Sequence, residues 1–313
     1  MAKKEDYFNI KATGATKVKR LKKNFKKAKK SKLGRQMKKR KRLVILLMRT
    51  IPALNKENYY SNEIDRYYMS NSQYKSFLQC EAATMAKING EWVPPGSEAL
   101  LFGQYVHAWL EGKQVFDEFK RNTPSLFTQK GQLYKQYQLA DLMIEAIQHD
   151  ELCMFVLQGA KEVIVTAELF GVPWKGKLDV YNPAGSRFAD LKTTRSLREK
   201  VWNPEIGYCS FVEAYGYIGQ MALYAEMEKR MTGRNEWLEP LIVGVSKEDP
   251  PDKAVINIDK GRMEVELEEI EQRMGRILQV KHGGEKPERC ERCKYCRATN
   301  QLNSIIHFSE LIS

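Results

Sequence analysis

The sequence predicts an α/β fold with a central mixed β-sheet flanked by helices. Three strand-like runs stand together at about 161–194, and further strand-like runs alternate with helical patterns after them. Helical patterns also precede this block, and the chain has no internal repeat. With 313 residues, of which 42% are hydrophobic, it can bury a sizeable core in one large domain or two smaller ones.

The other elements follow from periodicity and from helix start and stop signals. Ser97 is the expected N-cap of the helix that contains His107, and Gly233 is the expected end of a long helix. Cys80 is expected within the first short helix. In chain order we expect helices at 68–87, 97–112, 132–158, 210–231 and 262–281, and strands at 239–245 and 253–259.

The net charge of +13 divides the chain into a basic leading segment and a slightly acidic remainder. Residues 1–50 hold 20 Lys and Arg against 2 Asp and Glu, a net charge of +18, which leaves −5 for the rest. We expect this segment to be a disordered or transiently helical tail that binds polyanions, or an upstream extension with Met48 as the start. Residues 55–300 are then the folded domain, and 301–313 a C-terminal tail.

The sequence contains no apolar run long enough for a membrane span. Leu43 to Met48, the longest apolar run near the N-terminus, is too short and too late for a secretory signal. We therefore expect a cytoplasmic protein with no membrane partner. In that compartment its six cysteines are reduced thiols or metal ligands rather than disulfides.

The turn between the second and third strands predicts their register. The segment 182–186, with the sequence NPAGS, consists of turn-forming residues. If Asn182 pairs with Arg187, Asp179 lies opposite Asp190. Side chains alternate along a strand, so the two faces of the hairpin can be listed: Lys177, Asp179, Asp190 and Lys192 on one, and Leu178, Val180, Ala189 and Leu191 on the other.

Two aspartates placed opposite one another point to a bound cation. Their carboxylates would lie about 5 Å apart, and such groups repel unless a proton or cation lies between them. Mg²⁺ prefers oxygen ligands of this kind. The alternative is a solvated hairpin face of mixed charge.

Asp179, Asp190 and Lys192 form a D…DxK pattern that is similar to the signature of the PD-(D/E)XK nuclease superfamily. Upstream, 103–107 (GQYVH) resembles the GxxxH helix motif of its RecB-like branch. Downstream, 220–224 (QMALY) resembles the QxxxY helix motif of that branch. The resemblance spans roughly 58–300 and is strongest to phage-encoded RecE-like enzymes, which are related to exodeoxyribonuclease VIII. It implies the restriction-endonuclease-like core of this superfamily.

The resemblance implies a role for each matching residue. Asp179 and Asp190 would hold one or two Mg²⁺ or Mn²⁺ ions, with His107 completing the metal shell. The main-chain carbonyl of Leu191 could add a ligand. Lys192 would orient or help to deprotonate the attacking water and stabilise charge on the phosphate. Taken alone, His107 would be an ordinary hydrogen-bonded helix histidine.

Three further residues are candidates for the same site. Gln220 and Tyr224 share one helix face and would position the DNA backbone or the carboxylates. The alternative for Tyr224 is an ordinary tyrosine packed on the sheet. Glu168, one strand before the hairpin, is a further acidic candidate.

The cysteines near the C-terminus suggest a second metal centre. Cys290, Cys293 and Cys296 have the close spacing that binds Zn²⁺ or an iron–sulfur cluster, and Cys80 is the candidate fourth ligand. One early and three late cysteines resemble the iron–sulfur staple of AddB-type helicase-nucleases and CRISPR adaptation nucleases. That implies a [4Fe–4S] cluster, whereas the unusual spacing keeps Zn²⁺ as the alternative. We expect the remaining two, Cys153 and Cys209, to be buried.

As a whole, the resemblance implies a Mg²⁺-dependent DNA exonuclease acting from duplex ends in phage-type homologous recombination. It would be a phage or prophage protein in the bacterial cytoplasm, a homo-oligomer with a single-strand annealing protein as partner. Arg195, Arg198 and Lys200 could line a DNA channel, or belong to a solvated loop. The alternatives are a structure-specific or CRISPR-type endonuclease, and a metal-stapled DNA-binding module without catalytic activity.

Overall fold

The structure is a computed structural model that describes residues 52–302 and 304–309. From Asn55 on, the chain forms one compact unit. The basic segment at 1–50 lies outside the described residues, so the polyanion-binding tail stays a prediction. In the part that is described, no helix is both long and apolar enough to cross a membrane.

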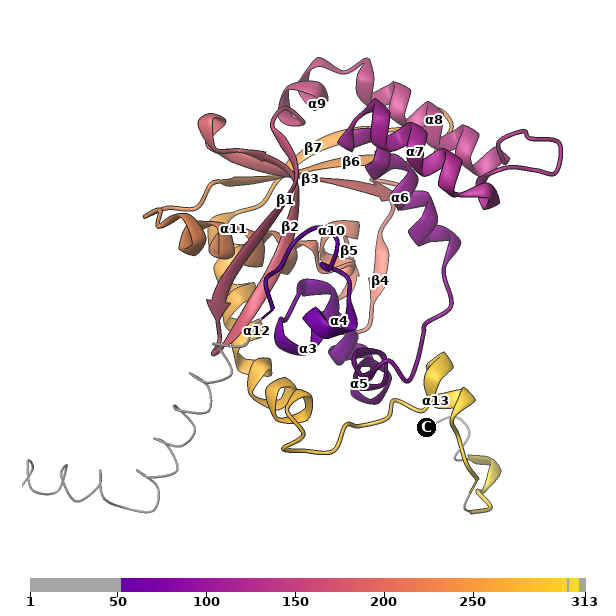
Figure 1. Cartoon of the computed structure of the whole chain (residues 1–313), viewed down its shortest axis with the longest axis vertical. Coiled ribbons are helices and arrows are strands. Elements are labelled where there is room, and N and C mark those ends of the chain that lie inside the picture. The colour runs from indigo at the N-terminus through magenta and orange to yellow at the C-terminus, as the bar shows by residue number, and fades with distance from the viewer. Residues whose placement is uncertain (1–51, 303, 310–313) are drawn as a thin grey trace, which may run out of the picture. The chain divides into compact units, whose positions relative to one another are not determined.

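A five-stranded mixed sheet forms the centre of this unit (Figure 1). β1 pairs antiparallel with β2, and β2 with β3. β3 runs parallel to β6, which pairs antiparallel with β7. The predicted α/β fold with a mixed sheet is confirmed. The strands are β1 (Ala160–Leu169), β2 (Val172–Asn182), β3 (Arg187–Thr194), β6 (Glu239–Ser246) and β7 (Lys253–Asn257).

Helices cover both faces of this sheet (Figure 1). The apolar cluster around Trp174 of β2 includes side chains of α4, α11 and α12. The cluster around Val243 of β6 includes side chains of α6, α8 and α9. The helices are α3 (Asn62–Tyr67), α4 (Asn71–Gln79), α5 (Glu81–Asn89), α6 (Glu98–Glu111), α7 (Lys113–Asn122), α8 (Lys135–Gln148), α9 (Glu151–Val156), α10 (Phe211–Ala214), α11 (Tyr217–Thr232), α12 (Lys260–Lys281) and α13 (Lys294–Ala298).

The β2–β3 hairpin has the register that its turn predicts. Asn182 pairs with Arg187, and the same register places Asp179 opposite Asp190, one position beyond the last pair of the ladder. The Asn182 side chain also accepts a hydrogen bond from the Gly185 N–H at 2.9 Å, which stabilises the turn. Counting from the turn was therefore sufficient to align the two strands.

One detail of the predicted hairpin is wrong. Leu178 packs in the cluster of α11 and α12, whereas Val180, Ala189 and Leu191 pack in the cluster of α6 and α8. The alternation of side chains therefore changes between Leu178 and Val180. The facing residue of β1, Glu162, has a φ of 55°, in the left-handed region that side chains rarely adopt. This distortion of β1 lies opposite the point at which the alternation of β2 changes.

Three predicted helices are each divided in two. Cys80 separates α4 from α5, Asp150 caps α9 after the end of α8, and Gly216 separates α10 from α11. Gly216 has a φ of 63°, which glycine adopts without strain. The helix α7 and the small hairpin of β4 (Val201–Asn203) and β5 (Gly207–Cys209) were not predicted.

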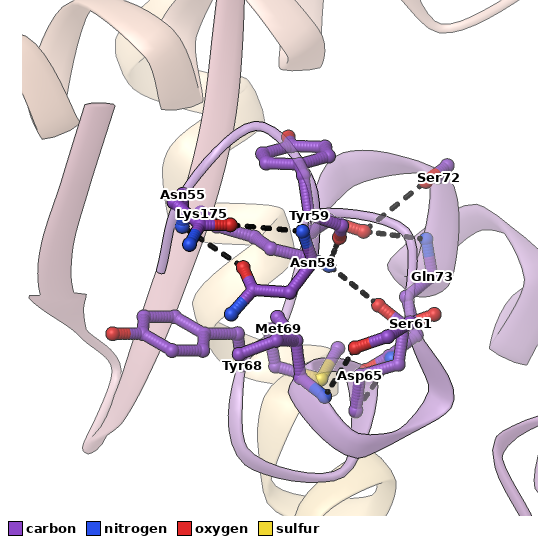
Figure 2. A network of polar contacts seen from close by, with 12 residues as sticks. Asn55, Asn58, Tyr59, Ser61, Asp65, Tyr68, Met69, Ser72, Gln73 and Lys175 are labelled. Carbon is purple, nitrogen blue, oxygen red and sulfur yellow. Dashed lines mark hydrogen bonds and ion pairs between the residues drawn. The ribbon is translucent and has the colours of Figure 1, made fainter. Parts of the chain in front are cut away.

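A buried lysine of β2 holds the first residues of the compact unit against the sheet (Figure 2). The Lys175 ammonium lies 2.7 Å from the Asp65 carboxylate and donates to the Tyr59 carbonyl. Burial lowers the pKa of Lys175, and the hydrogen bond that its ammonium donates to Asp65 partly offsets this effect. Lys281, at the end of α12, donates to the Gln73 side chain in the same region at 2.7 Å. Two buried ammonium groups thus anchor α3 and α4.

We expect Lys175→Met to destabilise the domain, because the largely buried Asp65 carboxylate would lose its partner. Removing one member of a buried ion pair costs about 3 kcal/mol or more. Urea unfolding should therefore show a lower midpoint for this variant. The double variant Asp65→Asn, Lys175→Met should recover part of the loss, and Lys87→Met, at an exposed position of α5, should be neutral. Wild-type stability of Lys175→Met would contradict the anchoring role.

Candidate active site

Two buried aspartates at the end of the β2–β3 ladder form the centre of the candidate site. Asp179 is 7% exposed and Asp190 is 2% exposed. The Leu191 N–H donates to Asp179 Oδ2 at 2.8 Å, which ties this carboxylate to the backbone of β3. Buried like charges repel, so the surrounding groups must compensate for them.

Asp190 is held by groups from two elements. The Gln220 amide on α11 donates to Asp190 Oδ1 at 2.7 Å, and the Asn71 amide on α4 lies 3.5 Å from the Gln220 carbonyl oxygen. The Lys192 ammonium lies 2.5 Å from Asp190 Oδ2. That buried oxygen nevertheless accepts no hydrogen bond of good geometry, which leaves it capacity for a further ligand.

Asp179 belongs to a second group of potential ligands. His107 on α6 places Nδ1 3.5 Å from Asp179 Oδ2. Glu162 on β1 is 6% exposed and forms an ion pair with Lys177. One ligand atom each from His107, Glu162 and Asp179 lies within 4.8 Å of the others. Imidazole nitrogen and carboxylate oxygens at this spacing can hold a divalent cation.

The electrostatics of Asp179 fit such a cation. Burial, followed by the charge of Asp190, raises the pKa of Asp179 to about 6. His107, Lys192 and the Leu191 N–H act in the opposite direction without cancelling the shift. The carboxylate therefore lacks sufficient compensating positive charge, which a divalent cation would supply.

Lys192 keeps its proton in this environment. Burial alone would lower its pKa, but Asp190 and Asp179 outweigh burial and raise the pKa above the ordinary value. Its ammonium also lies 4.7 Å from the ring centre of Tyr217, a cation–π distance. Nearby, burial and the charge of Lys192 lower the pKa of Lys75 to about 8. The two lysines thus differ in how readily they give up a proton.

Tyr224 packs against the β2 backbone at Gly176. A Cβ at this glycine would lie 2.8 Å from Tyr224 Cε1 and 2.7 Å from the terminal methyl of Met227. Any other residue at 176 would therefore displace the ring. Burial, with smaller contributions from Asp190 and Asp179, raises the pKa of Tyr224. The tyrosine both packs on the sheet and lies within electrostatic reach of the site.

The structure does not bring Glu168 to the site. Glu168 is exposed and pairs with Pro173 close to the β1–β2 turn. It lies six residues beyond Glu162, about 20 Å along a strand. The predicted strand is correct, but the prediction that Glu168 belongs to the site is wrong.

Glu162 and Asn71 are the residues that sequence reasoning missed. Pairing of Val163 with Leu178 in the β1–β2 hairpin places Glu162 opposite Asp179. Counting back from the turn at 170–171 would have found it, in the way that worked for the next hairpin. Asn71 carries no such signal, because it reaches the site only through the packing of α4 on α11.

A cleft of about 810 Å³ is lined by Asn71 and by Tyr217, whose ring lies against the Lys192 ammonium, but the two aspartates and Lys192 do not line it. Lys75 and the β4–β5 turn at 203–206 also line this cleft, together with several acidic side chains, among them Glu213, Glu266 and Glu269. The expected DNA-binding residues lie between β3 and β4 and are all exposed: Arg195, Arg198 and Lys200. Arg195 forms an ion pair with Glu199 at 3.5 Å and Arg198 one with Asp252 at 3.1 Å.

The cysteines gather at a different place. Cys80, Cys290, Cys293 and Cys296 have sulfur atoms within 4.8 Å of one another, so the fold brings the four candidate ligands together. Of the other two cysteines, Cys153 is buried as predicted, whereas Cys209 on β5 is only half-buried, so the prediction for Cys209 was wrong.

Comparison with known proteins agrees with this picture. Residues 70–299 match a protein family described as "PDDEXK-like domain of unknown function (DUF3799)". A crystal structure from Eubacterium rectale, described as a "Putative exonuclease", is 40% identical and covers 83% of this chain and 98% of its own, with a TM-score of 0.79. Another solved structure, SSO0001, covers 72% of this chain and 91% of its own at 13% identity. Its TM-score of 0.24 is too low to indicate a shared fold. No curated protein matches the sequence.

The raised pKa of Asp179 predicts that the metal-free protein becomes less stable as pH rises. The folded protein keeps this proton up to pH of about 6, whereas the unfolded chain releases it near 3.8. The stabilising contribution is thus complete below 3.8 and lost as pH rises through 6. In chelator, we expect the melting temperature to fall by about 3 °C between pH 5 and 7.5, as followed by circular dichroism.

Two comparisons isolate Asp179 in this experiment. Asp179→Asn should flatten that part of the pH profile, because the titrating group is removed. Mn²⁺ should raise the melting temperature of the wild-type protein more at pH 7.5 than at pH 5, because the cation competes with the proton. Identical pH profiles of the wild-type and Asp179→Asn proteins would contradict the assignment.

Proposed function

Because the chain belongs to the family of PDDEXK-like domains described as DUF3799, we propose that it is a metal-dependent DNA exonuclease that hydrolyses phosphodiester bonds from duplex ends. The observation that carries the proposal is the meeting of the buried Asp179 and Asp190 with Lys192, whose ammonium lies against Tyr217, a residue that lines an open cleft. The similarity to the Eubacterium rectale protein described as a "Putative exonuclease" supports nuclease activity.

The residues of the site suit Mg²⁺ or Mn²⁺. Asp179 and Asp190 would hold the ion, with His107 and Glu162 as the neighbouring ligands and the Leu191 carbonyl as a further candidate. When bound, a divalent cation lowers the pKa of its water and neutralises charge that develops on the phosphate. Asp190 Oδ2, which accepts no hydrogen bond of good geometry, and the raised pKa of Asp179 both support this assignment.

Lys192 acts in this proposal as a fixed positive charge. Its raised pKa keeps the ammonium protonated near neutral pH, so it stabilises charge on the phosphate instead of taking a proton from water. Tyr217 and Asp190 hold the ammonium from two sides. The position of Lys192 two residues after Asp190 on β3 directs both side chains to one face of the strand.

Gln220 and Tyr224 are positioning residues in this proposal. Gln220 holds one oxygen of Asp190 and is itself held by Asn71, so α4 and α11 together orient the carboxylate. Tyr224 lies one helical turn later and packs over Gly176 of β2, the strand that also carries Asp179. Gln220 thus orients the Asp190 carboxylate directly, and Tyr224 supports the β2 backbone that carries Asp179.

The path of the DNA follows the cleft toward the β4–β5 hairpin. Trp202 and Tyr208 on this hairpin are 61% and 71% exposed, with ring centres 5.1 Å apart. Exposed aromatic rings let bases of a single strand stack on them. Lys200 and Arg195 lie just before the hairpin and add positive charge. We assign to these four residues the binding of the single DNA strand that enters the site.

The wider role rests on the similarity to RecE-like enzymes. In this proposal the protein is a homo-oligomer that acts in phage-type homologous recombination in the bacterial cytoplasm. A single-strand annealing protein is its partner. The motifs at 103–107 and 220–224 support this similarity, because both lie on helices that reach the aspartates.

Hydrolysis of linear duplex DNA should require Mg²⁺ or Mn²⁺ together with both Asp190 and Lys192. Asp190→Asn and Lys192→Ala should each lower the rate by at least about 100-fold, because each removes charge stabilisation in the transition state. Release of acid-soluble nucleotides measures the rate. Glu168→Gln, remote from the site, serves as the matched control and should keep wild-type activity. A wild-type rate for Asp190→Asn would refute the site.

The proposed mode of attack requires a free DNA end. Linear duplex should be shortened progressively, whereas a covalently closed circle of the same sequence should survive. Gel electrophoresis with end-labelled DNA distinguishes the two, with Lys192→Ala as the blank. Linearisation of the closed circle at a comparable rate would support the endonuclease alternative.

Trp202→Ala should weaken binding to frayed ends about 5-fold or more, because stacking of one base is lost.

A further inference from the structure

A second cluster of metal-ligating side chains lies apart from the candidate active site. Cys80, between α4 and α5, meets Cys296 of α13, which is 216 residues away in sequence. Cys290 and Cys293 complete the cluster, and all four are free thiols. Cys80 and Cys296 are buried. Four thiols in one place suit either Zn²⁺ or an iron–sulfur cluster.

The spacing of the sulfur atoms separates these two possibilities. Sγ of Cys296 lies 3.6 Å from Sγ of Cys80 and 3.9 Å from Sγ of Cys290. Thiolates bound at 2.3 Å to one tetrahedral Zn²⁺ lie about 3.8 Å from one another. Both distances therefore match the edge of a tetrahedron around a single ion.

A [4Fe–4S] cluster, which the resemblance to AddB-type staples implies, does not fit this arrangement. Its four thiolates bind four different irons at the corners of a cube, so they lie farther apart than the ligands of one ion. Here all four sulfur atoms lie within 4.8 Å of one another. We propose that Cys80, Cys290, Cys293 and Cys296 bind one Zn²⁺ ion in a closed tetrahedral site.

The backbone around the sulfur atoms supports thiolates. The Ala83 N–H donates to Cys80 Sγ at 3.4 Å, and the Cys293 N–H donates to Cys290 Sγ at 3.3 Å. The Cys296 N–H donates to Cys293 Sγ at 3.4 Å. Such hydrogen bonds stabilise the deprotonated sulfur that a metal requires, and orient it.

The two ligand-bearing segments are also joined outside the cluster. Arg276 of α12 donates to both carboxylate oxygens of Glu81, at 2.9 and 2.8 Å. The Glu288 N–H donates to the same carboxylate at 2.8 Å, and its carbonyl accepts from the Ala82 N–H at 2.9 Å. These contacts hold the residue after Cys80 beside the segment that precedes Cys290. The site is therefore prepared for its ion by the surrounding protein.

The proposed ion has a structural role that does not depend on nuclease activity. It links α5 to the end of the domain and closes the chain around the whole sheet. Because the metal binds the folded chain, its binding energy adds to the stability of the fold. Zn²⁺ has no redox chemistry, so the centre should be insensitive to air.

Elemental analysis of the full chain tests the proposal. The protein is produced in iron-replete cells and purified without air, so that an oxygen-sensitive cluster would survive. We expect one zinc per chain, no acid-labile sulfide and a colourless protein. Iron with sulfide, iron without sulfide, or absence of both metals would each overturn the proposal.

Variants and cobalt locate the ion. Cys80→Ser should lose at least half of the zinc, whereas Cys209→Ser and His107→Ala should keep it, because neither residue belongs to the cluster. Wild-type protein with Co²⁺ in place of zinc should show the intense visible bands of tetrahedral thiolate coordination. This spectrum remains a test even if Cys80→Ser does not fold. Zinc that is lost in His107→Ala but kept in Cys80→Ser would place the ion in the active site and refute the proposal.

Discussion

The rest of the candidate site depends on the enforced proximity of two buried carboxylates. The pairing of β2 with β3 places Asp179 opposite Asp190, where burial and then the charge of Asp190 raise the pKa of Asp179. Lys192, His107 and Gln220 approach these carboxylates from three elements. Compensation for the two charges therefore requires β3, α6 and α11 to be in place together, and each has to pack before the site exists.

The local distortion of the sheet makes this convergence possible. α6 belongs to the apolar cluster on one face and α11 to the cluster on the other, yet both reach the aspartates. Their side chains meet where the alternation of β2 changes, between Leu178 and Val180. Glu162 lies there with a left-handed backbone, buried beside Asp179. A regular strand would direct this carboxylate differently, so the position of Glu162 beside Asp179 depends on the distortion.

The edges of the domain are held by polar contacts. The first described helices are anchored by the ammonium groups of Lys175 and Lys281, and the last segment is attached to α5 through Arg276 and the cysteine cluster. Burial of charge is costly unless it is paired, so each anchor is specific to its partner. These contacts hold the first and last described helices on the sheet, while the cleft lined by Tyr217 stays open.

Local signals in the sequence determined the α/β class, the strand order within the hairpin, and the register that brings Asp179 to Asp190. Turn chemistry and alternation act over a few residues, so they can be read without a structure. Only the tertiary structure decided what depends on distant packing. It selected Glu162 instead of Glu168, added Asn71 through the contact of α4 with α11, and set the sulfur spacing around Cys80. Each of these results depends on how helices pack on a distorted sheet, and no local pattern encodes that arrangement.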